Sequence, residues 1–176
     1  MKKTVGVLIV AFIAVAAPGC KQRQEQKQQV TYAPAPAPMV LQIDQLQQAA
    51  KMAPKNAEAW TNLGNALMDS HRYAEAVEAY EKSLALEPKN VNVLVDSGTC
   101  YRGVGKFDKA VAQYRKALKI DPNFPNAHRN LAVVLAYDLR NPKEGIKEFQ
   151  KYMEIAPNAP DIETIRQTVR ELSAKK

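Results

Sequence analysis

Four prolines recur at a nearly constant interval from residue 54 onward. Pro54, Pro88, Pro122 and Pro157 are separated by 34, 34 and 35 residues. Each follows a run with helical periodicity, and an asparagine suited to a turn or helix cap comes one or two positions later. Because proline ends a helix, this spacing predicts a repeating helix-turn-helix unit. Such a unit cannot bury its apolar stripe alone, so neighbouring units must stack into one continuous core.

The same residue types return at the same positions of each period. The first unit has Trp60, Leu63, Gly64, Leu67, Ala76, Tyr80, Ser83 and Pro88. The second has Leu94, Gly98, Tyr101, Ala110, Tyr114, Ala117 and Pro122, and the third has His128, Leu131, Ala132, Leu135, Gly145, Phe149 and Pro157. This pattern resembles the tetratricopeptide repeat (TPR), with Ser97 standing where a larger apolar residue is usual. The resemblance implies an all-α, right-handed superhelical solenoid of antiparallel helix pairs, A and B.

The repeat period divides the chain into an N-terminal region and a helical domain. The domain spans residues 41–176, with a half repeat at 41–56, full repeats at 57–90, 91–124 and 125–158, and a capping helix at 159–174. The third repeat is one residue longer, and we expect the extra residue in the turn between its two helices. Asn141 and Pro142 are expected to begin its helix B as N-cap and first residue.

The first nineteen residues read as a signal peptide. Two lysines precede Val5–Ala17, an uncharged run of thirteen residues that is too short to span a bilayer. Gly19 and Cys20 resemble the cleavage site of bacterial lipoproteins, although Ala17 stands where leucine is usual and Pro18 is uncommon there. The resemblance implies lipidation of Cys20, and Lys21 in place of aspartate favours the outer membrane. Residues 20–40, rich in Gln, Lys and Ala-Pro, are expected to form a flexible tether.

Charge and chemistry exclude several classes of function. The net charge is +7, but residues 1–40 carry 5 basic and 1 acidic residue, which leaves only +3 for the domain, and no basic stripe suggests nucleic-acid binding. Gly103-Val104-Gly105-Lys106 lacks the other residues of a phosphate-binding loop. The two histidines have no ligand partners at metal spacing, and Cys100 is expected to be a buried apolar residue. We therefore expect a non-enzyme without metal, cofactor or small-molecule substrate.

In the family, successive A helices line a concave face that takes a protein or peptide segment. The resemblance places the following residues on that face: Glu58, Thr61, Asn65, Met68, Asn92, Val95, Thr99, Arg102, Asn126, Arg129, Val133 and Ala136. Asparagine can pair with a peptide backbone, and arginine can bind a carboxylate. The alternative is that these are ordinary solvated helix faces.

The residues of this chain can be compared with those of TPR proteins that bind chaperone tails. Repeats that bind the acidic C-terminal tails of chaperones use Lys, Asn and Arg at five positions. Here those positions hold Thr61, Asn65, Asp96, Asn126 and Asn130. Only Asn65 agrees, and Asp96 would repel an acidic tail, so this specificity is not expected.

The sequence thus predicts a lipid-anchored scaffold that docks a protein in the bacterial envelope, for example in a pilus, secretion pore or wall-modifying complex. Two alternatives stay open. One is a module that binds cell-wall glycans, for which exposed aromatics on the concave face would be needed and are not found there. The other is an accessory subunit of an envelope enzyme system, such as cytochrome maturation.

Overall fold

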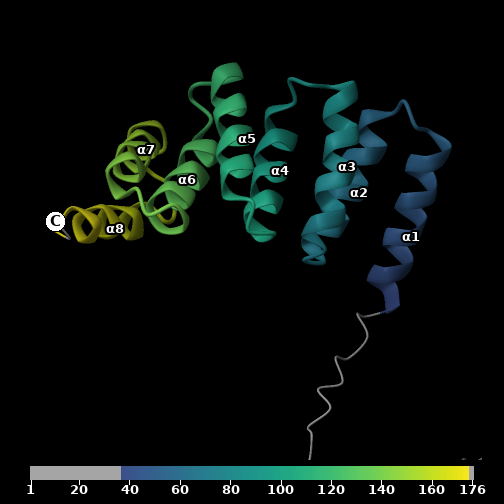
Figure 1. Cartoon of the computed structure of the whole chain (residues 1–176), viewed down its shortest axis with the longest axis horizontal. Coiled ribbons are helices and arrows are strands. Elements are labelled where there is room, and N and C mark those ends of the chain that lie inside the picture. Colours follow the sequence, from purple (N-terminus) through teal and green to yellow (C-terminus); the bar gives the residue numbers. More distant parts are fainter. Residues whose placement is uncertain (1–36, 175–176) are drawn as a thin grey trace, which may run out of the picture. The chain divides into compact units, whose positions relative to one another are not determined.

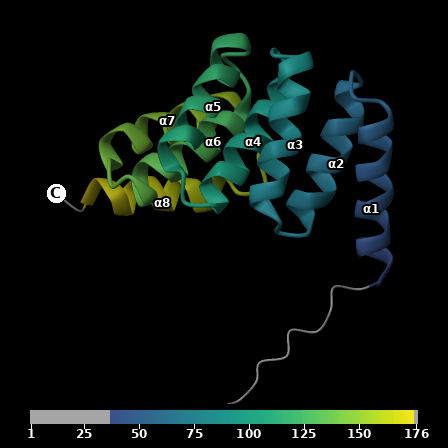
Figure 2. The ribbon, with the colours of Figure 1, turned by 45° about the vertical axis from the view of Figure 1, so that its right-hand side comes forward.

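The computed structural model describes residues 37–174, with side chains from residue 41 onward. The predicted signal peptide, Cys20 and residues 21–36 lie outside the described part. Within this part of the chain, eight α-helices follow one another along a row (Figures 1 and 2). They are α1 (Ala37–Met52), α2 (Ala57–Asp69), α3 (Tyr73–Leu86), α4 (Val91–Gly103), α5 (Phe107–Ile120), α6 (Pro125–Val133), α7 (Pro142–Ile155) and α8 (Ile162–Ala174). A π-helix, η1 (Val134–Asp138), continues α6 directly.

The helices pack as pairs that stack on their neighbours. α2 pairs with α3, α4 with α5, and α6 with α7, while α3 contacts α4 and α5 contacts α6 between pairs. α1 packs on α2 from one end, and α8 packs on α7 at the other. Residues 37–174 contain no strand. The all-α stack expected from the period is therefore confirmed, with α2, α4 and α6 as A helices and α1, α3, α5 and α7 as B helices.

Local residue choices fix where the helices begin and turn. The side chains of Asn56, Asn90 and Asn141 accept hydrogen bonds from backbone N–H groups in the first turns of α2, α4 and α7, at 3.2, 3.2 and 3.3 Å. Each A helix joins its B helix through three residues, and the middle one has a left-handed φ: 58° at His71, 73° at Gly105 and 53° at Arg140. The chain therefore makes the same turn three times, although only one of them uses glycine, the residue best suited to positive φ.

The extra residue of the third repeat is not where the sequence led us to expect it. The turn at residues 139–141 has the same length as those at 70–72 and 104–106. The insertion lies instead inside helix A, where Val134–Asp138 forms the π-helix. A one-residue insertion in a helix is accommodated by widening one turn to i→i+5 hydrogen bonding. The backbone bond from Leu139 N–H to Val134 O, at 2.9 Å, is of this kind.

The half repeat also begins earlier than expected. α1 starts at Ala37, four residues inside the segment expected to be tether. Pro38 is its second residue, where the missing N–H would have no intrahelical partner in any case. At the other end, α8 begins at Ile162, three residues after the start of the segment expected to be the capping helix.

Small residues allow the two helices of a pair to approach closely. A Cβ on Gly64 would lie 2.5 Å from the Tyr80 ring, and one on Gly98 would lie 2.6 Å from the Tyr114 ring. The buried side chains form one cluster that runs from Ile43 to Leu135. A second, smaller cluster joins η1, α7 and α8 around Phe149, Tyr152 and Ile165.

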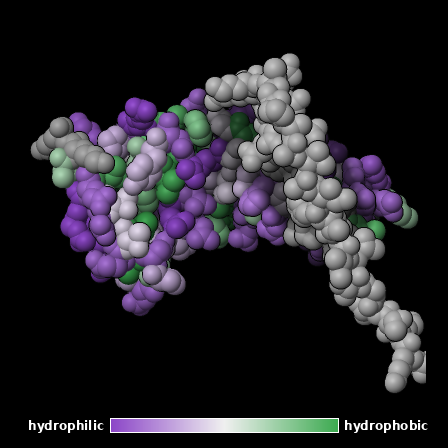
Figure 3. Space-filling view, turned by 90° about the horizontal axis from the view of Figure 1, so that it is seen from below, coloured by the Kyte–Doolittle hydropathy of each residue, from purple (hydrophilic) through white to green (hydrophobic). Residues whose placement is uncertain are grey.

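One side of the described molecule is largely hydrophilic where its surface is seen in Figure 3, with small hydrophobic areas separated from one another. None of the helices within residues 37–174 has both the length and the apolar composition needed to cross a bilayer.

Candidate protein-binding groove

The A helices lie next to one another, since α4 contacts both α2 and α6. The structure sorts the predicted groove residues by exposure. Exposed are Glu58, Asn92, Arg102 and Asn126; half-buried are Thr61, Asn65, Met68, Thr99, Arg129 and Val133; buried are Val95 and Ala136. Val95, only 4% exposed, therefore supports this face and offers little surface to a partner. We call the face lined by the ten residues other than Val95 and Ala136 the A-helix face.

Tyrosines of the B helices α3 and α5 reach the A-helix face. On the α2 part of this face, the Tyr80 hydroxyl donates to Asn65 Oδ1 at 2.8 Å. This bond occupies the Asn65 carbonyl and leaves its amide N–H groups available to a peptide backbone. Beside it, Thr61 Oγ1 lies 2.7 Å from Ser83 Oγ. The α2 part of the face is therefore held by bonds between helices A and B of one unit.

Asp96, on α4, is a partly buried carboxylate whose charge acts on Tyr80. Burial, and then repulsion from Asp69, raise the pKa of the Asp96 carboxyl. Among the described residues Asp96 forms no ion pair and no side-chain hydrogen bond. A carboxylate that is partly removed from water and lacks a cation is unfavourable, and a cationic or hydrogen-bond-donating group from a partner would compensate it.

A notch between α4 and α6 is a pocket of about 80 Å³, which we call the α4–α6 notch. Thr99 Oγ1 lies 3.2 Å from the Tyr114 hydroxyl, and Asn130 Nδ2 donates to the same Thr99 oxygen at 3.4 Å. Arg102 and Arg129 line the pocket as well. This notch thus joins side chains of two successive repeats, which lie 31 residues apart at Asn130 and Thr99.

Both arginines of the α4–α6 notch are already paired within the chain. Arg102 Nε donates to Asp138 Oδ2 at 2.5 Å, and Arg129 Nε donates to Asp161 Oδ2 at 2.5 Å. Asp161 also accepts from the Tyr152 hydroxyl at 2.5 Å, and this bond, followed by the one from Arg129, lowers the pKa of the Asp161 carboxyl. The A-helix face is therefore not a free cationic surface, and the arginines give it little net preference for an acidic segment.

Sequence reasoning missed Asp138 and Asp161. Asp138 lies at the end of the π-helix, and the bond to Arg102 spans 36 positions of the sequence. Its orientation depends on the π turn, which no repeat pattern could place. Asp161 precedes α8 and reaches back to α6 across 32 positions.

The residues considered for chemistry are accounted for by packing. Cys100 is fully buried as expected, and burial, followed by the charge of Asp96, raises the pKa of its thiol to about 12. Such a thiol is inert at neutral pH.

His128 occupies the position in its helix A that Trp60 occupies in the first repeat. Its Nδ1 lies 2.7 Å from Glu148 Oε2, and its Nε2 lies 2.9 Å from the carbonyl oxygen of Pro122. Trp60 Nε1 donates to Pro54 O at 3.1 Å in the same way. Within residues 37–174 no group of His, Cys, Asp and Glu is arranged to hold a metal ion.

The arrangement defines a helical-repeat solenoid with a polar face built from its A helices. Residues 57–90 match the family model described as tetratricopeptide repeat, and residues 98–136 match a second one described as TPR repeat. The small glutamine-rich tetratricopeptide repeat-containing protein 2 of Mycosarcoma maydis is 52% identical over 42 residues, which cover 24% of this chain and 12% of that protein. The chain thus carries tetratricopeptide repeats.

Solved structures agree with this fold. A crystal structure of MamA is similar with a TM-score of 0.61 and 25% identity, covering 65% of this chain and 62% of the MamA chain. A second MamA structure has a TM-score of 0.63 and 26% identity over 69% of each chain. The TPR domain of Arabidopsis OM64 has a TM-score of 0.61 and 19% identity, covering 65% of this chain and 94% of that one. The described part is therefore a TPR solenoid, and it spans less than two thirds of the first MamA chain.

Proposed function

We propose that this protein is a non-catalytic scaffold that binds a protein segment on its A-helix face while tethered to a membrane of the bacterial envelope. A TPR fold supports a role in protein–protein interaction. The observation that carries the proposal is the A-helix face itself: its polar groups are fixed by bonds from buried tyrosines, while Asn92 and Asn126 stay exposed and Asp96 has no cation. Fixed side chains lose little entropy when a partner binds.

The tether rests on the sequence alone. Gly19-Cys20 after an uncharged run supports lipidation of Cys20, and Lys21 supports placement at the outer membrane. Stable anchoring requires more than one acyl chain, as a diacyl or triacyl modification would supply. A scaffold held in this way would collect its partner at the membrane surface, as assembly of a pilus, secretion pore or wall-modifying complex requires.

Photo-crosslinking in cells tests the groove. A photoreactive residue at Asn92 or Asn126 leaves the inter-repeat bonds intact, because both side chains are exposed. The matched control is Lys116, an exposed residue on the B helix α5. We expect one protein to be captured from Asn92 and Asn126 and not from Lys116. Capture from Lys116 alone would show that the partner uses another face.

Labelling with a fatty-acid analogue tests the anchor separately. Cys20→Ser removes the thiol that a thioether-linked diacylglycerol requires, so we expect labelling and membrane fractionation to be lost. The matched control is Cys100→Ser, which changes a buried thiol of the domain. Labelling that persists in Cys20→Ser would exclude the anchor without bearing on the groove.

A glycan-binding role receives less support from the described residues. Sugar rings need exposed aromatic side chains on which to stack. Among the large hydrophobic side chains that are exposed, the aromatic one is Tyr137. It lines a shallow surface with Arg140, Pro142 and Leu172, apart from the pocket between α4 and α6. The groove proposal therefore rests on polar contacts to a polypeptide.

A further inference from the structure

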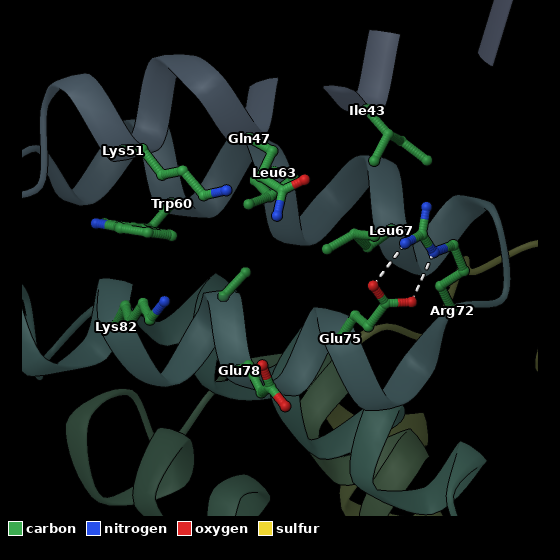
Figure 4. Close-up of a pocket in the computed structure, with 11 residues that line it drawn as sticks. Ile43, Gln47, Lys51, Trp60, Leu63, Leu67, Arg72, Glu75, Glu78 and Lys82 are labelled. Atoms are coloured by element: carbon green, nitrogen blue, oxygen red, sulfur yellow. Dashed lines mark hydrogen bonds and ion pairs between the residues drawn. The ribbon is translucent and has the colours of Figure 1, made fainter. Parts of the chain in front are cut away.

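A second recess lies away from the A-helix face. It is a pocket of about 120 Å³ between α1 and α3, with α2 beneath it (Figure 4). Its floor is apolar and well packed, and consists of Ile43, Trp60, Leu63, Leu67 and Ala79. None of the predicted groove residues lines this α1–α3 pocket. A volume of this size suits one aliphatic side chain.

The rim of the pocket differs in charge between its two ends. Lys51 and Lys82 stand near Trp60 at one end, and the Lys82 ammonium lies 4.2 Å from the centre of the indole ring. At the other end Arg72 and Glu75 form a bidentate, neutral pair, with bonds of 2.7 and 2.5 Å. Glu78 lines the pocket between the two ends. Within residues 41–174 neither lysine forms an ion pair, so the end beside Trp60 is the more cationic one.

In the next two repeats a side chain bridges the equivalent recess, and it stands seven positions before the repeat proline. The recess between α3 and α5 is a pocket of about 290 Å³, and in it Glu81 accepts a hydrogen bond from the Tyr101 hydroxyl. Arg115 reaches across from α5 to Glu144 on α7, with Nη2 and Oε2 3.5 Å apart. At the same position of α1 stands Gln47, which forms no side-chain hydrogen bond among the described residues. Glu75, the equivalent of Glu144, turns instead to Arg72.

We propose that the α1–α3 pocket is a second docking site, for a partner-protein segment that presents an aliphatic side chain next to an aspartate or glutamate. The aliphatic group would lie over Ile43 and Leu63, where it removes apolar surface from water. The carboxylate would lie between Lys51 and Lys82 and accept charge-assisted hydrogen bonds from both. This site goes beyond the proposed groove, because the two share no residue and lie on different helix faces.

The fluorescence of Trp60, which lines the pocket, can report binding at this site. Trp60 is the single tryptophan of the sequence, so intrinsic fluorescence reads the pocket directly. The probe is the blocked tripeptide acetyl-Gly-Leu-Glu-amide, titrated into the full chain. We expect a saturable change in Trp60 emission, because the carboxylate draws Lys82 away from the indole face. One side chain and one carboxylate predict a Kd on the order of 1 mM.

Three peptide controls separate the contributions. Acetyl-Gly-Leu-Gln-amide keeps the shape and removes the charge, and acetyl-Gly-Ala-Glu-amide keeps the charge and removes the aliphatic group. We expect both to bind at least about threefold more weakly, as an exposed charge contact or a few buried methyl groups would suggest. Acetyl-Gly-Leu with a free carboxylate tests a chain terminus, and preference for it would overturn the assignment to an internal segment.

Gln47→Arg is the decisive variant. It reproduces the arginine that bridges α5 and α7 and places it opposite Glu75, without removing any floor residue or lysine. We expect this substitution to abolish the Trp60 response. Lys51→Gln and Lys82→Gln should each weaken binding about two- to fivefold, whereas Lys109→Gln, which changes the lysine above Tyr101 in the next recess, should not. A response that survives Gln47→Arg, or equal binding of the Glu and Gln peptides, would refute the site.

Discussion

At the scale of single residues, the stack depends on a few positions where size or charge leaves no freedom. Gly64 and Gly98 lie so close to tyrosine rings that an added methyl group would clash with them. Asp96 has the opposite character, since its carboxylate is partly buried without a cation. The first kind of residue stabilises the fold, and the second lowers stability while shaping a surface. Substitution of either glycine should therefore lower the stability of the domain, and substitution of Asp96 by a neutral residue should raise it.

Gly64→Ala should destabilise the domain by roughly 1–3 kcal/mol, because its Cβ would lie 2.5 Å from the Tyr80 ring. Thermal or urea unfolding followed by circular dichroism measures this. The control is Gly105→Asn, where φ is +73° and no atom lies within 4 Å. Asparagine tolerates that conformation, so this variant should lose less than about 1 kcal/mol. Equal losses would show that the close approach of Gly64 to Tyr80 is unimportant.

Asp96→Asn should raise stability at pH 7 by up to about 1 kcal/mol, since the group is half-exposed and solvent screens it. Burial raises the pKa of Asp96 in the folded state above 3.8. The folded state therefore binds more protons, and the wild type loses stability as pH rises through that folded pKa. The gain in the variant should vanish below pH 4. Unfolding curves at both pH values measure it, and a gain that is independent of pH would contradict the proposed cause.

At the scale of elements, each helix is set by its ends as much as by its apolar stripe. Asparagine caps begin α2, α4 and α7, whereas Phe124, which precedes α6, makes no side-chain cap bond. Pro125 compensates in part, because its fixed φ suits the first position of a helix. The π-helix is the other departure, and it brings Asp138 to Arg102. Capping was readable from the residues, whereas the π turn was not.

Asn90→Ala should cost about 1 kcal/mol, because it removes the bond from Val93 N–H and leaves that donor without its cap. The control is Asn92→Ala two residues later, an exposed position inside α4 where alanine is the better helix former. That variant should be neutral or slightly more stable. Chemical unfolding of both proteins gives the comparison, and a loss at Asn92 as large as at Asn90 would point to a general cost of losing asparagine.

At the scale of the whole described molecule, the two hydrophobic clusters divide the stack unevenly. The larger one joins α1 to α6, and the smaller one holds α7 and α8 around Ile165. In a linear stack each unit is stabilised by its own packing and by its neighbours. The C-terminal end should therefore open locally at a lower free energy than the rest.

Ile165→Ala should destabilise α8 and the adjoining part of α7 by about 2–4 kcal/mol, because Ile165 is the fully buried anchor of α8. Hydrogen exchange should accelerate in α7 and α8 and stay unchanged in α2–α5. The control is Thr164→Ala, an exposed neighbour on α8. Acceleration spread evenly from α2 to α8 would mean that the molecule opens as one cooperative unit.

The sequence by itself determined the helical repeat, its period, the helix pairs and most caps, because prolines, asparagines and small residues act locally and recur. It also determined that Cys100 is buried. Tertiary structure alone decided where the inserted residue goes, that Val95 is buried, and that Arg102 and Arg129 are paired with Asp138 and Asp161. The two ion pairs join residues 36 and 32 positions apart. A repeat pattern specifies which residues face a neighbour, but not which charges meet there or how an inserted residue is accommodated.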